Sequence, residues 1–366
     1  MSTYVQFLEG DKTSLTETLA TSTWTNNLNN LTVAFSGSSG TSLEQVYTSA
    51  TSSKMFYIDV FQTASHDDAA EVQYTVSYGH RIGCGSIDFT NDVGSFGIGA
   101  SKCIYSQYQQ LIYGDDITQF KFGEHPSEHI YVINVERARL KHNLKPGSLN
   151  LKLSASVAGQ EDWTGYYEGQ AFNIELTDDS VTAEGSAENS NIGRRYNIVS
   201  GANGIRSGSN PNQVGGSASF GHFYPDAGII VLNPDAFGFM YYPDAIGGLR
   251  PQTNIASTTN IDKNNEKLFQ AISGAGYFIV DSEEDITSQY FFARARNNEF
   301  NYTNNPTFVD STGTLKYTSM INNPKTYITT VGLYNANLDL VAVAKLSQPI
   351  SKDKTKEALI RIKLDY

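Results

Sequence analysis

Apolar and polar residues alternate most regularly at the C-terminal end of the chain. In the segment EALIRIKLDY every second residue is apolar, and most of the residues between them are charged. Successive side chains of a β-strand point to opposite faces, so this segment predicts a strand with one apolar face. That face would hold Ala358, Ile360, Ile362, Leu364 and Tyr366.

The segment TYITTVGLYNANLDLVAVAKL, residues 326–346, predicts a β-hairpin that precedes this last strand. Two apolar-rich runs flank an Asn-rich turn, which is the usual pattern of a hairpin. We expect Val331 and Leu333 to share one face, and alternate residues of the second run to line another: Leu340, Ala342, Ala344 and Leu346. No residue of the segment has a side chain suited to catalysis, so the pattern favours a structural role.

Alternation with period two also marks the middle of the chain, from EVQYTVSYGHRIGCGS onward. Tyr131, Ile133 and Val135 share one face, and the sequence Lys-Pro-Gly-Ser at 145–148 provides a turn. Alternating leucines follow the turn, at positions 149, 151 and 153. These features predict a hairpin between residues 131–135 and 149–153.

Two segments have the spacing of amphipathic helices. In the first, at about 100–113, Ile104, Tyr108, Leu111 and Ile112 fall on one helical face and Gly114 ends the helix. The second, at about 262–274, has Asp262 as its expected N-cap. Its buried face is expected to hold Leu268, Phe269 and Ile272.

These patterns predict a mainly β protein, with antiparallel sheets in a sandwich-like body, a few short helices, and a C-terminal β-hairpin plus final strand. We expect three segments. Residues 1–65 form a Thr-, Ser- and Asn-rich arm with short strands, and residues 66–255 form a β-rich body with one helix and a long Gly/Ser/Asn loop. Residues 256–366 form a helix and the C-terminal β module.

Composition supports this fold class and excludes some partners. Only 17% of the 366 residues are charged, against roughly 25% in an average globular protein, while 22 Tyr and 19 Phe favour strands. The net charge of −12 argues against a nucleic-acid partner, which clustered Lys and Arg would bind. No apolar run approaches the ~20 residues that span a bilayer, so we expect no membrane span.

The N-terminal sequence MSTYVQFLEGDK has neither a basic region nor an apolar core, so we expect no signal peptide and synthesis in the cytoplasm. The chain has two cysteines, Cys84 and Cys103. They could form one disulfide, but their number and spacing favour two reduced thiols.

Candidate chemistry is sparse. The sequence EHPSEH places His125 and His129 four residues apart beside two glutamates, which on a helix could bind zinc. Pro126 interrupts the pair and the next residues read as a strand, so these histidines are weak metal candidates. The chain has no nucleophile elbow, no P-loop and no dinucleotide-binding fingerprint. We therefore predict no catalytic residue, no cofactor and no enzymatic activity.

The sequence EDWTGYYEG offers a different kind of contact. Trp163, Tyr166 and Tyr167 lie among three carboxylates, a combination that can bind or cleave sugars. They are candidates for a glycan or partner contact. The alternative function is thus a carbohydrate-binding adhesin or depolymerase.

The end of the chain also resembles a known class of proteins. NNEFNYTNNPTFVDSTG and NNPKTYITTVGLYNANLDLVAVAKLSQPISKDKTKEALIRIKLDY resemble a recurrent ending of virion structural proteins in contractile-tailed, T-even-like bacteriophages of marine bacteria. Upstream segments such as IYVINVERARLKHNLKPGSLNLKLS and GHFYPDAGIIVLNPDAF are similar to the same class, so the resemblance covers roughly residues 70–366.

This resemblance implies a non-enzymatic structural component of the virion, most simply a tail baseplate protein that joins neighbouring subunits or fibres. A neck or tail-tube connector is the alternative position. It implies other virion proteins as partners, with symmetric copies in multiples of three or six, and carries over no catalytic residue. The hairpin is then the expected assembly element, through Val331, Leu333, Tyr334, Leu340 and Ala342.

Overall fold

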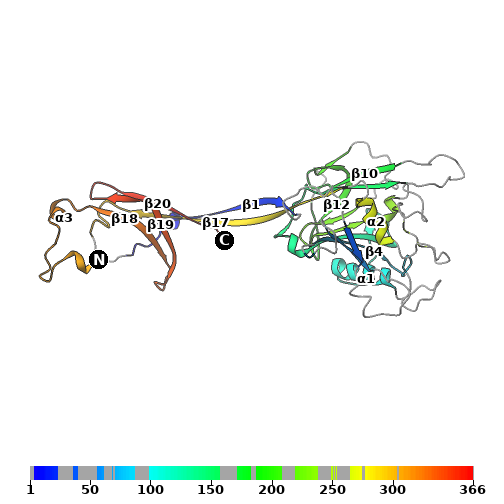
Figure 1. Cartoon of the computed structure of the whole chain (residues 1–366), viewed down its shortest axis with the longest axis horizontal. Coiled ribbons are helices and arrows are strands. Elements are labelled where there is room, and N and C mark those ends of the chain that lie inside the picture. The colour runs from blue at the N-terminus through cyan, green and yellow to red at the C-terminus, as the bar shows by residue number, and fades with distance from the viewer. Residues whose placement is uncertain are drawn as a thin grey trace. The chain divides into compact units, whose positions relative to one another are not determined.

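The chain consists of two compact units in the computed structural model (Figure 1). Unit 1 comprises Met1–Leu19 and Asp285–Tyr366, and unit 2 comprises Ala20–Glu284. The structure describes residues 4–23, 36–39, 56–61, 68, 71–86, 99–156, 171–182, 187–207, 219–237, 249, 251, 253, 264–273, 277–302 and 305–365. This division differs from the three expected segments, because the arm is shared between the units and the helix near 264–273 belongs to unit 2.

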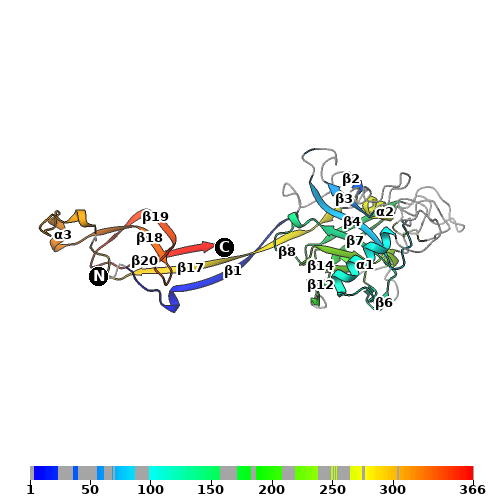
Figure 2. The same ribbon diagram turned by 90° about the horizontal axis from the view of Figure 1, so that it is seen from below.

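Antiparallel strands dominate the described residues, which confirms the predicted mainly β fold. Unit 2 contains one large curled sheet, ordered β16-β9-β10-β12-β14-β15-β7-β4-β3-β2 (Figure 2). Short strands β11 (Glu188–Ser190) and β13 (Ile205–Arg206) pair with β12, and β5 (Lys121–Phe122) pairs with β6 (His125–Pro126). The bounds of the main strands are β2 Ser36–Ser39, β3 Tyr57–Phe61, β4 Val72–His80, β7 His129–Val135, β9 Asn150–Ser156, β10 Ala171–Asp178, β12 Gly193–Ala202, β14 Gly221–Tyr224, β15 Ile229–Leu232 and β16 Tyr277–Ile279.

The predicted hairpin between residues 131–135 and 149–153 is wrong. Both segments are strands, β7 and β9, but β7 pairs with β4 and β15 whereas β9 pairs with β10 and β16. The chain between them forms β8 (Asn143–Leu144), which pairs with β17 (Asp281–Ala295) instead. Alternation shows which face of a strand is buried, and it carries no information about which strand lies beside it.

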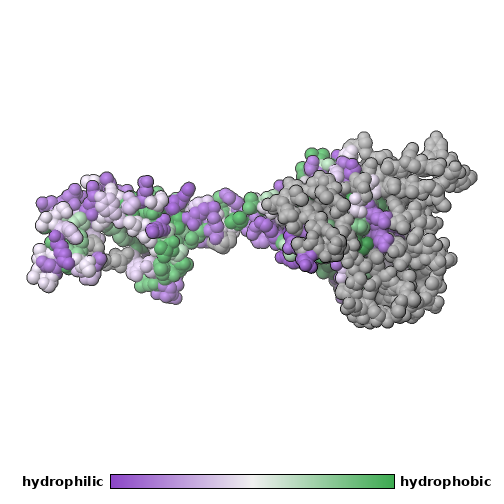
Figure 3. Space-filling model, viewed as in Figure 1, coloured by the Kyte–Doolittle hydropathy of each residue, from purple (hydrophilic) through white to green (hydrophobic). Residues whose placement is uncertain are grey.

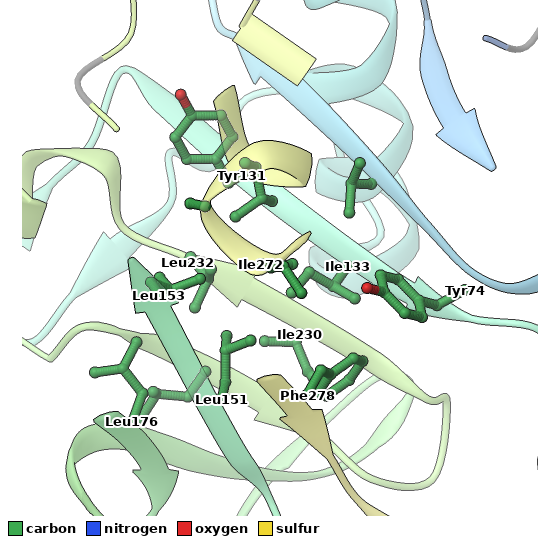
Figure 4. Packing of buried hydrophobic residues seen from close by; sticks show 14 of the residues in the cluster. Tyr74, Tyr131, Ile133, Leu151, Leu153, Leu176, Ile230, Leu232, Ile272 and Phe278 are labelled. Atoms are coloured by element: carbon green, nitrogen blue, oxygen red, sulfur yellow. The ribbon is translucent and has the colours of Figure 1, made fainter. Parts of the chain in front are cut away.

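Both faces of the central strands are buried, and each face has its own core. In β7 the side chains of Ile130 and Val132 pack with helix α1 (Ala100–Tyr113), whereas Tyr131 and Ile133 point to the opposite side. On that side they join Leu151 of β9 and residues of helix α2 (Asn264–Ser273), as Figure 4 shows. The predicted sandwich-like body is therefore one sheet that curls over its own core.

Both predicted helices are present. Helix α1 ends at Gly114, whose φ of 79° is the left-handed conformation that glycine adopts without strain. Its Ile104, Tyr108 and Ile112 are buried as predicted, but Leu111 is 43% exposed. Ser101, Tyr105 and Gln109 complete the buried face, which is therefore rotated away from Leu111.

Helix α2 buries Leu268 and Ile272 and half-buries Phe269, as predicted. The expected N-cap, Asp262, lies outside the described residues. Within the described chain, no helix combines the length and the apolar character of a membrane-spanning segment.

Unit 1 holds the predicted C-terminal hairpin and final strand. The hairpin strands β18 (Thr326–Tyr334) and β19 (Leu340–Lys352) pair only with each other among the described strands, and α3 (Ser319–Asn322) precedes them. A separate sheet has the order β1-β17-β20, with β1 at Lys12–Ser22, β17 at Asp281–Ala295 and β20 at Ala358–Asp365. In β20 the alternation is confirmed, since Ala358, Ile360 and Ile362 are buried between exposed neighbours.

Candidate functional site

The register of the C-terminal hairpin decides which of its residues face outward. Val331 lies opposite Ala344 and Leu333 lies opposite Ala342. Residues directly opposite each other on paired strands share a face, so the prediction that these two sets line different faces is wrong. A register shift between Leu333 and Tyr334 separates Leu340 from this set.

The shared face forms the small core of unit 1. Leu333 is 7% exposed, and the half-buried Val331 and Ala342 pack with it against Ile360 and Ile362 of β20. Three of the five residues expected to form the assembly hairpin therefore contact the chain's own core. Only Tyr334 and Leu340 of that set remain exposed.

The opposite face of the hairpin is apolar and exposed to solvent. We define this outer face as Gly332, Tyr334, Leu340, Val341 and Val343; the last three are 54%, 66% and 58% exposed. A Cβ at position 332 would lie 2.9 Å from Cε2 of Tyr334 and 3.2 Å from Cδ1 of Leu340, so these two side chains cover the glycine. The outer face is therefore an exposed apolar surface, and Figure 3 shows hydrophobic residues gathered over the region of the hairpin.

Two valines of the outer face were missed by the sequence analysis. In LVAVA the small Ala342 and Ala344 were expected to line one face with Leu340, and Ala342 was included in the assembly set, whereas the larger Val341 and Val343 are the exposed residues. The sequence feature that could have revealed them is the absence of polar residues around the alanines. A strand with one solvent-exposed face normally alternates apolar with polar residues.

Exposed hydrophobic residues are concentrated in unit 1. Of the 22 large hydrophobic residues that are exposed in the described chain, 17 belong to this unit, although it is much the shorter. Its hydrophobic cluster has three buried members, against 27 and 13 in the two clusters of unit 2. The exposed residues are Tyr4, Val5, Leu8, Leu15, Leu19, Phe300, Tyr302, Tyr317, Ile321, Tyr327, Tyr334, Leu338, Leu340, Val341, Val343, Ile350 and Leu359.

The two units also differ in charge. Unit 1 has 11 Lys and Arg against 10 Asp and Glu, a net charge of +1. Unit 2 has 15 against 28, a net charge of −13. The acidic character of the protein therefore belongs to unit 2 alone.

No family model matches this chain, and no curated protein or solved structure is detectably similar to it. Its chemistry must accordingly be read from its own residues.

A buried lysine connects the base of the hairpin, where β18 begins and β19 ends, to the loop that follows β17. The Lys352 side chain is fully buried, and its Nζ donates to the carbonyl oxygens of Asn297 and Asp353, both at 3.1 Å, and to Oδ1 of Asn301 at 2.8 Å. Three oxygen acceptors satisfy the three N–H groups of the ammonium. This contact fixes the base of the hairpin.

We expect the substitution Lys352→Met to destabilise unit 1 by about 2 kcal/mol, because it leaves partly buried acceptors without their charged donor. Urea unfolding followed by circular dichroism would measure the change. The exposed Lys354→Met is the matched control and should shift stability by less than ~0.5 kcal/mol. Equal stability of the two variants would contradict a structural role for the Lys352 ammonium.

The two candidate metal-binding histidines lie on different strands. His125 is exposed on β6, whereas His129 begins β7 and uses both ring nitrogens within unit 2. Its Nε2 lies 2.9 Å from Oδ1 of Asp235, and its Nδ1 lies 3.4 Å from the hydroxyl of Tyr78. No group of three or more His, Cys, Asp or Glu in the described ranges could hold a metal ion.

The neighbours of His129 form a polar network that reaches the surface of unit 2. The rings of His80 and His129 meet edge-on at 5.7 Å, and burial, helped by His129, lowers the pKa of His80 to about 4. Arg81 donates to Glu128 at 2.7 Å, which lowers the pKa of that carboxyl. These contacts link β4, β7 and the 3-10 turn at Pro234–Phe237. They therefore have a structural role in unit 2.

The remaining sequence candidates are placed as follows. Trp163, Tyr166 and Tyr167 lie outside the described residues, so the glycan or partner contact stays a prediction. Cys84 is buried and Cys103 is exposed, and both are free thiols. Burial raises the pKa of the Cys84 thiol.

Proposed function

We propose that this protein is a non-enzymatic structural component of a bacteriophage tail, situated in the baseplate, where unit 1 joins it to neighbouring subunits or fibres. The observation that carries the proposal is the concentration of exposed hydrophobic residues in unit 1. Monomeric soluble proteins rarely expose large contiguous apolar surfaces, and such surfaces mark interaction sites.

The energetics of unit 1 support an obligate assembly partner. Apolar surface gains about 25 cal/mol for each Å² removed from water, and three buried cluster members contribute little of this within one chain. Interfaces of permanent complexes bury roughly 2,000 Å² or more and resemble a protein core. Packing of the exposed side chains against neighbouring proteins would supply the missing burial.

The position in a phage tail rests on the resemblance of the C-terminal sequence. The resemblance covers roughly residues 70–366, and its two C-terminal segments, residues 297–313 and 322–366, lie within unit 1 and contain 10 of its 17 exposed hydrophobic residues. The protein would be made in the host cytoplasm and incorporated into the virion. Its partners would be other virion proteins, present in three- or six-fold multiples.

Composition of the virus particle tests this proposal. Quantitative mass spectrometry of purified virions should find the protein at a copy number that is a multiple of three. Particles made without it should stop at one defined step of tail assembly. Absence of the protein from purified virions would refute the proposal, whereas presence at the neck or tube end would move it to the alternative position.

A further inference from the structure

We infer that the turn at residues 81–86 of unit 2 is a pH-sensitive closure, which is stable while the His80 side chain is neutral and opens when that side chain takes up a proton. The turn follows the end of β4 and contains Cys84, which is buried. The inference concerns unit 2 alone and goes beyond the proposed function, which rests on unit 1.

The turn connects the end of β4 to the beginnings of both helices of unit 2. The carbonyl oxygen of Gly85 accepts from Nδ2 of Asn264, the first residue of α2, at 2.9 Å. The hydroxyl oxygen of Ser86 accepts from the backbone amide of Ser101, in the first turn of α1, at 3.1 Å. Opening of the turn would therefore release the start of each helix from the sheet.

The closed conformation depends on a neutral His80. This residue ends β4 and is 6% exposed. Its Nδ1 accepts from the backbone amide of Ile82 at 3.2 Å, and its carbonyl oxygen accepts from the amide of Gly83 at 3.1 Å. Because Nδ1 is an acceptor, the neutral ring carries its proton on Nε2, and a second proton must go to Nδ1. Protonation therefore removes the contact with Ile82 and directs two N–H groups at each other.

The carboxylates near His80 already have partners. The titratable and charged groups that face its ring come from β4, β7 and the 3-10 turn that follows β15: Arg81, Glu128, His129 and Asp235. Glu128 pairs with Arg81 at 2.7 Å, and Asp235 lies 2.9 Å from Nε2 of His129. The ring of His129 meets that of His80 edge-on at 5.7 Å. A positive charge on His80 would thus be buried beside groups that are already paired, which disfavours the closed turn.

The opening equilibrium should therefore increase as the pH falls. In the open turn the His80 ring would titrate near its ordinary pKa of about 6.5, whereas in the closed turn its pKa is lowered to about 4. The open form binds the proton first, so opening is favoured by up to ~10-fold for each pH unit between these two values. From about pH 7 to about pH 4.5 the open fraction should rise by about 50-fold.

The labelling rate of Cys84 in the full-length protein tests the inference. Dithiodipyridine, a disulfide reagent that also reacts in acid, would label both cysteines, and peptide mass spectrometry would distinguish them. Cys84 is buried in the closed turn, whereas Cys103 on α1 is exposed. The ratio of the two rates therefore follows opening and cancels the pH dependence of the reagent. We expect this ratio to rise about 50-fold from about pH 7 to about pH 4.5.

Three variants separate local opening from other effects of acid. In His80→Asn the side-chain oxygen can accept from the Ile82 amide but does not titrate, so the labelling ratio should change by less than ~3-fold. His142→Asn, at an exposed position of the same unit, is the matched control and should show the full rise. His222→Phe alters acid stability of the whole unit, and it should also show the full rise because the turn opens locally. Circular dichroism would verify that each variant is folded.

Hydrogen–deuterium exchange of the wild-type protein gives a second measurement that needs no variant. The protection factors of the Ile82 and Gly83 amides should fall by the same factor as the labelling ratio rises, whereas amides in the middle of β7 should stay protected. Equal loss of protection in the turn and in β7 would show unfolding of the whole unit and would overturn the inference. So would a constant labelling ratio in the wild-type protein, a full rise in His80→Asn, or no rise in His222→Phe.

Discussion

Mild acid is expected to destabilise unit 2 by several kcal/mol, because two of its histidines are held neutral in the folded state. His222 on β14 is 1% exposed and packs between the rings of Phe122 and Tyr224. Burial, and secondarily the charge of Arg195, lowers the pKa of His222 to about 3. Its Nδ1 has no hydrogen-bond partner within the described residues. The pKa of His80 is lowered to about 4.

The direction in which stability changes with pH follows from proton binding. Both folded-state pKa values lie below the unfolded value of about 6.5, so the unfolded chain binds protons first as the pH falls. The stability contributed by the neutral histidines is therefore complete above pH ~6.5 and is lost as the pH falls towards the folded-state values. At about 1.4 kcal/mol per pKa unit, the full loss is about 5 kcal/mol for His222 and about 3 kcal/mol for His80.

Urea unfolding between about pH 4.5 and 6.5 measures this dependence in a range above the titration of most carboxylates. The slope of the free energy of unfolding against pH gives the number of protons that are taken up on unfolding. In His222→Phe this number should fall by about one, because the variant has no titratable group at this position. His142→Phe, at an exposed position of the same unit, is the control and should keep the wild-type slope. A His222→Phe variant with an unchanged slope would show that this imidazole does not govern acid stability.

The features predicted correctly from the sequence are those that one strand or helix determines by itself. The periodicity of residues 100–113 and 358–365 identified the buried face of β20 and, apart from Leu111, that of α1, since burial follows the period of the element. The choice of strand partners is non-local, which is why the alternating segments 131–135 and 149–153 were joined into a hairpin that does not exist.

The hairpin expected to hold the assembly site was predicted correctly as a structural element, but its faces were misassigned. The shift in register after Leu333 moves Leu340 off the inward face, and single-sequence periodicity does not show such a shift. The inward positions of β19 hold alanine, while valine lies outside. Side-chain size alone would have predicted the reverse, so the exposed apolar face could not be derived without the paired strands.

Replacement of Gly79 by valine is expected to destabilise unit 2 strongly. Gly79 lies on β4 opposite Ile130 of β7, beneath helix α1. A Cβ at this position would lie 2.8 Å from the backbone nitrogen of Tyr105 and 3.0 Å from its Cα. These are backbone atoms of the helix, so no change of rotamer can relieve the contact.

The helix cannot move away without breaking other contacts. The Tyr105 hydroxyl donates to the carbonyl of Ser127 at 3.0 Å and accepts from the amide of Phe120 at 3.1 Å, so the ring is fixed below the helix. Gly79→Val should therefore lower the free energy of unfolding by about 3 kcal/mol or more, and Gly79→Ala should lower it by about 1–3 kcal/mol. Thr75→Val, a substitution of nearly equal volume at a half-buried position of the same strand, is the control. Unfolding in urea, followed by circular dichroism at helix and sheet wavelengths, would show whether α1 and the sheet are lost together. If Gly79→Val were as stable as the control, the helix would have to pack on β4 less closely than the backbone distances require.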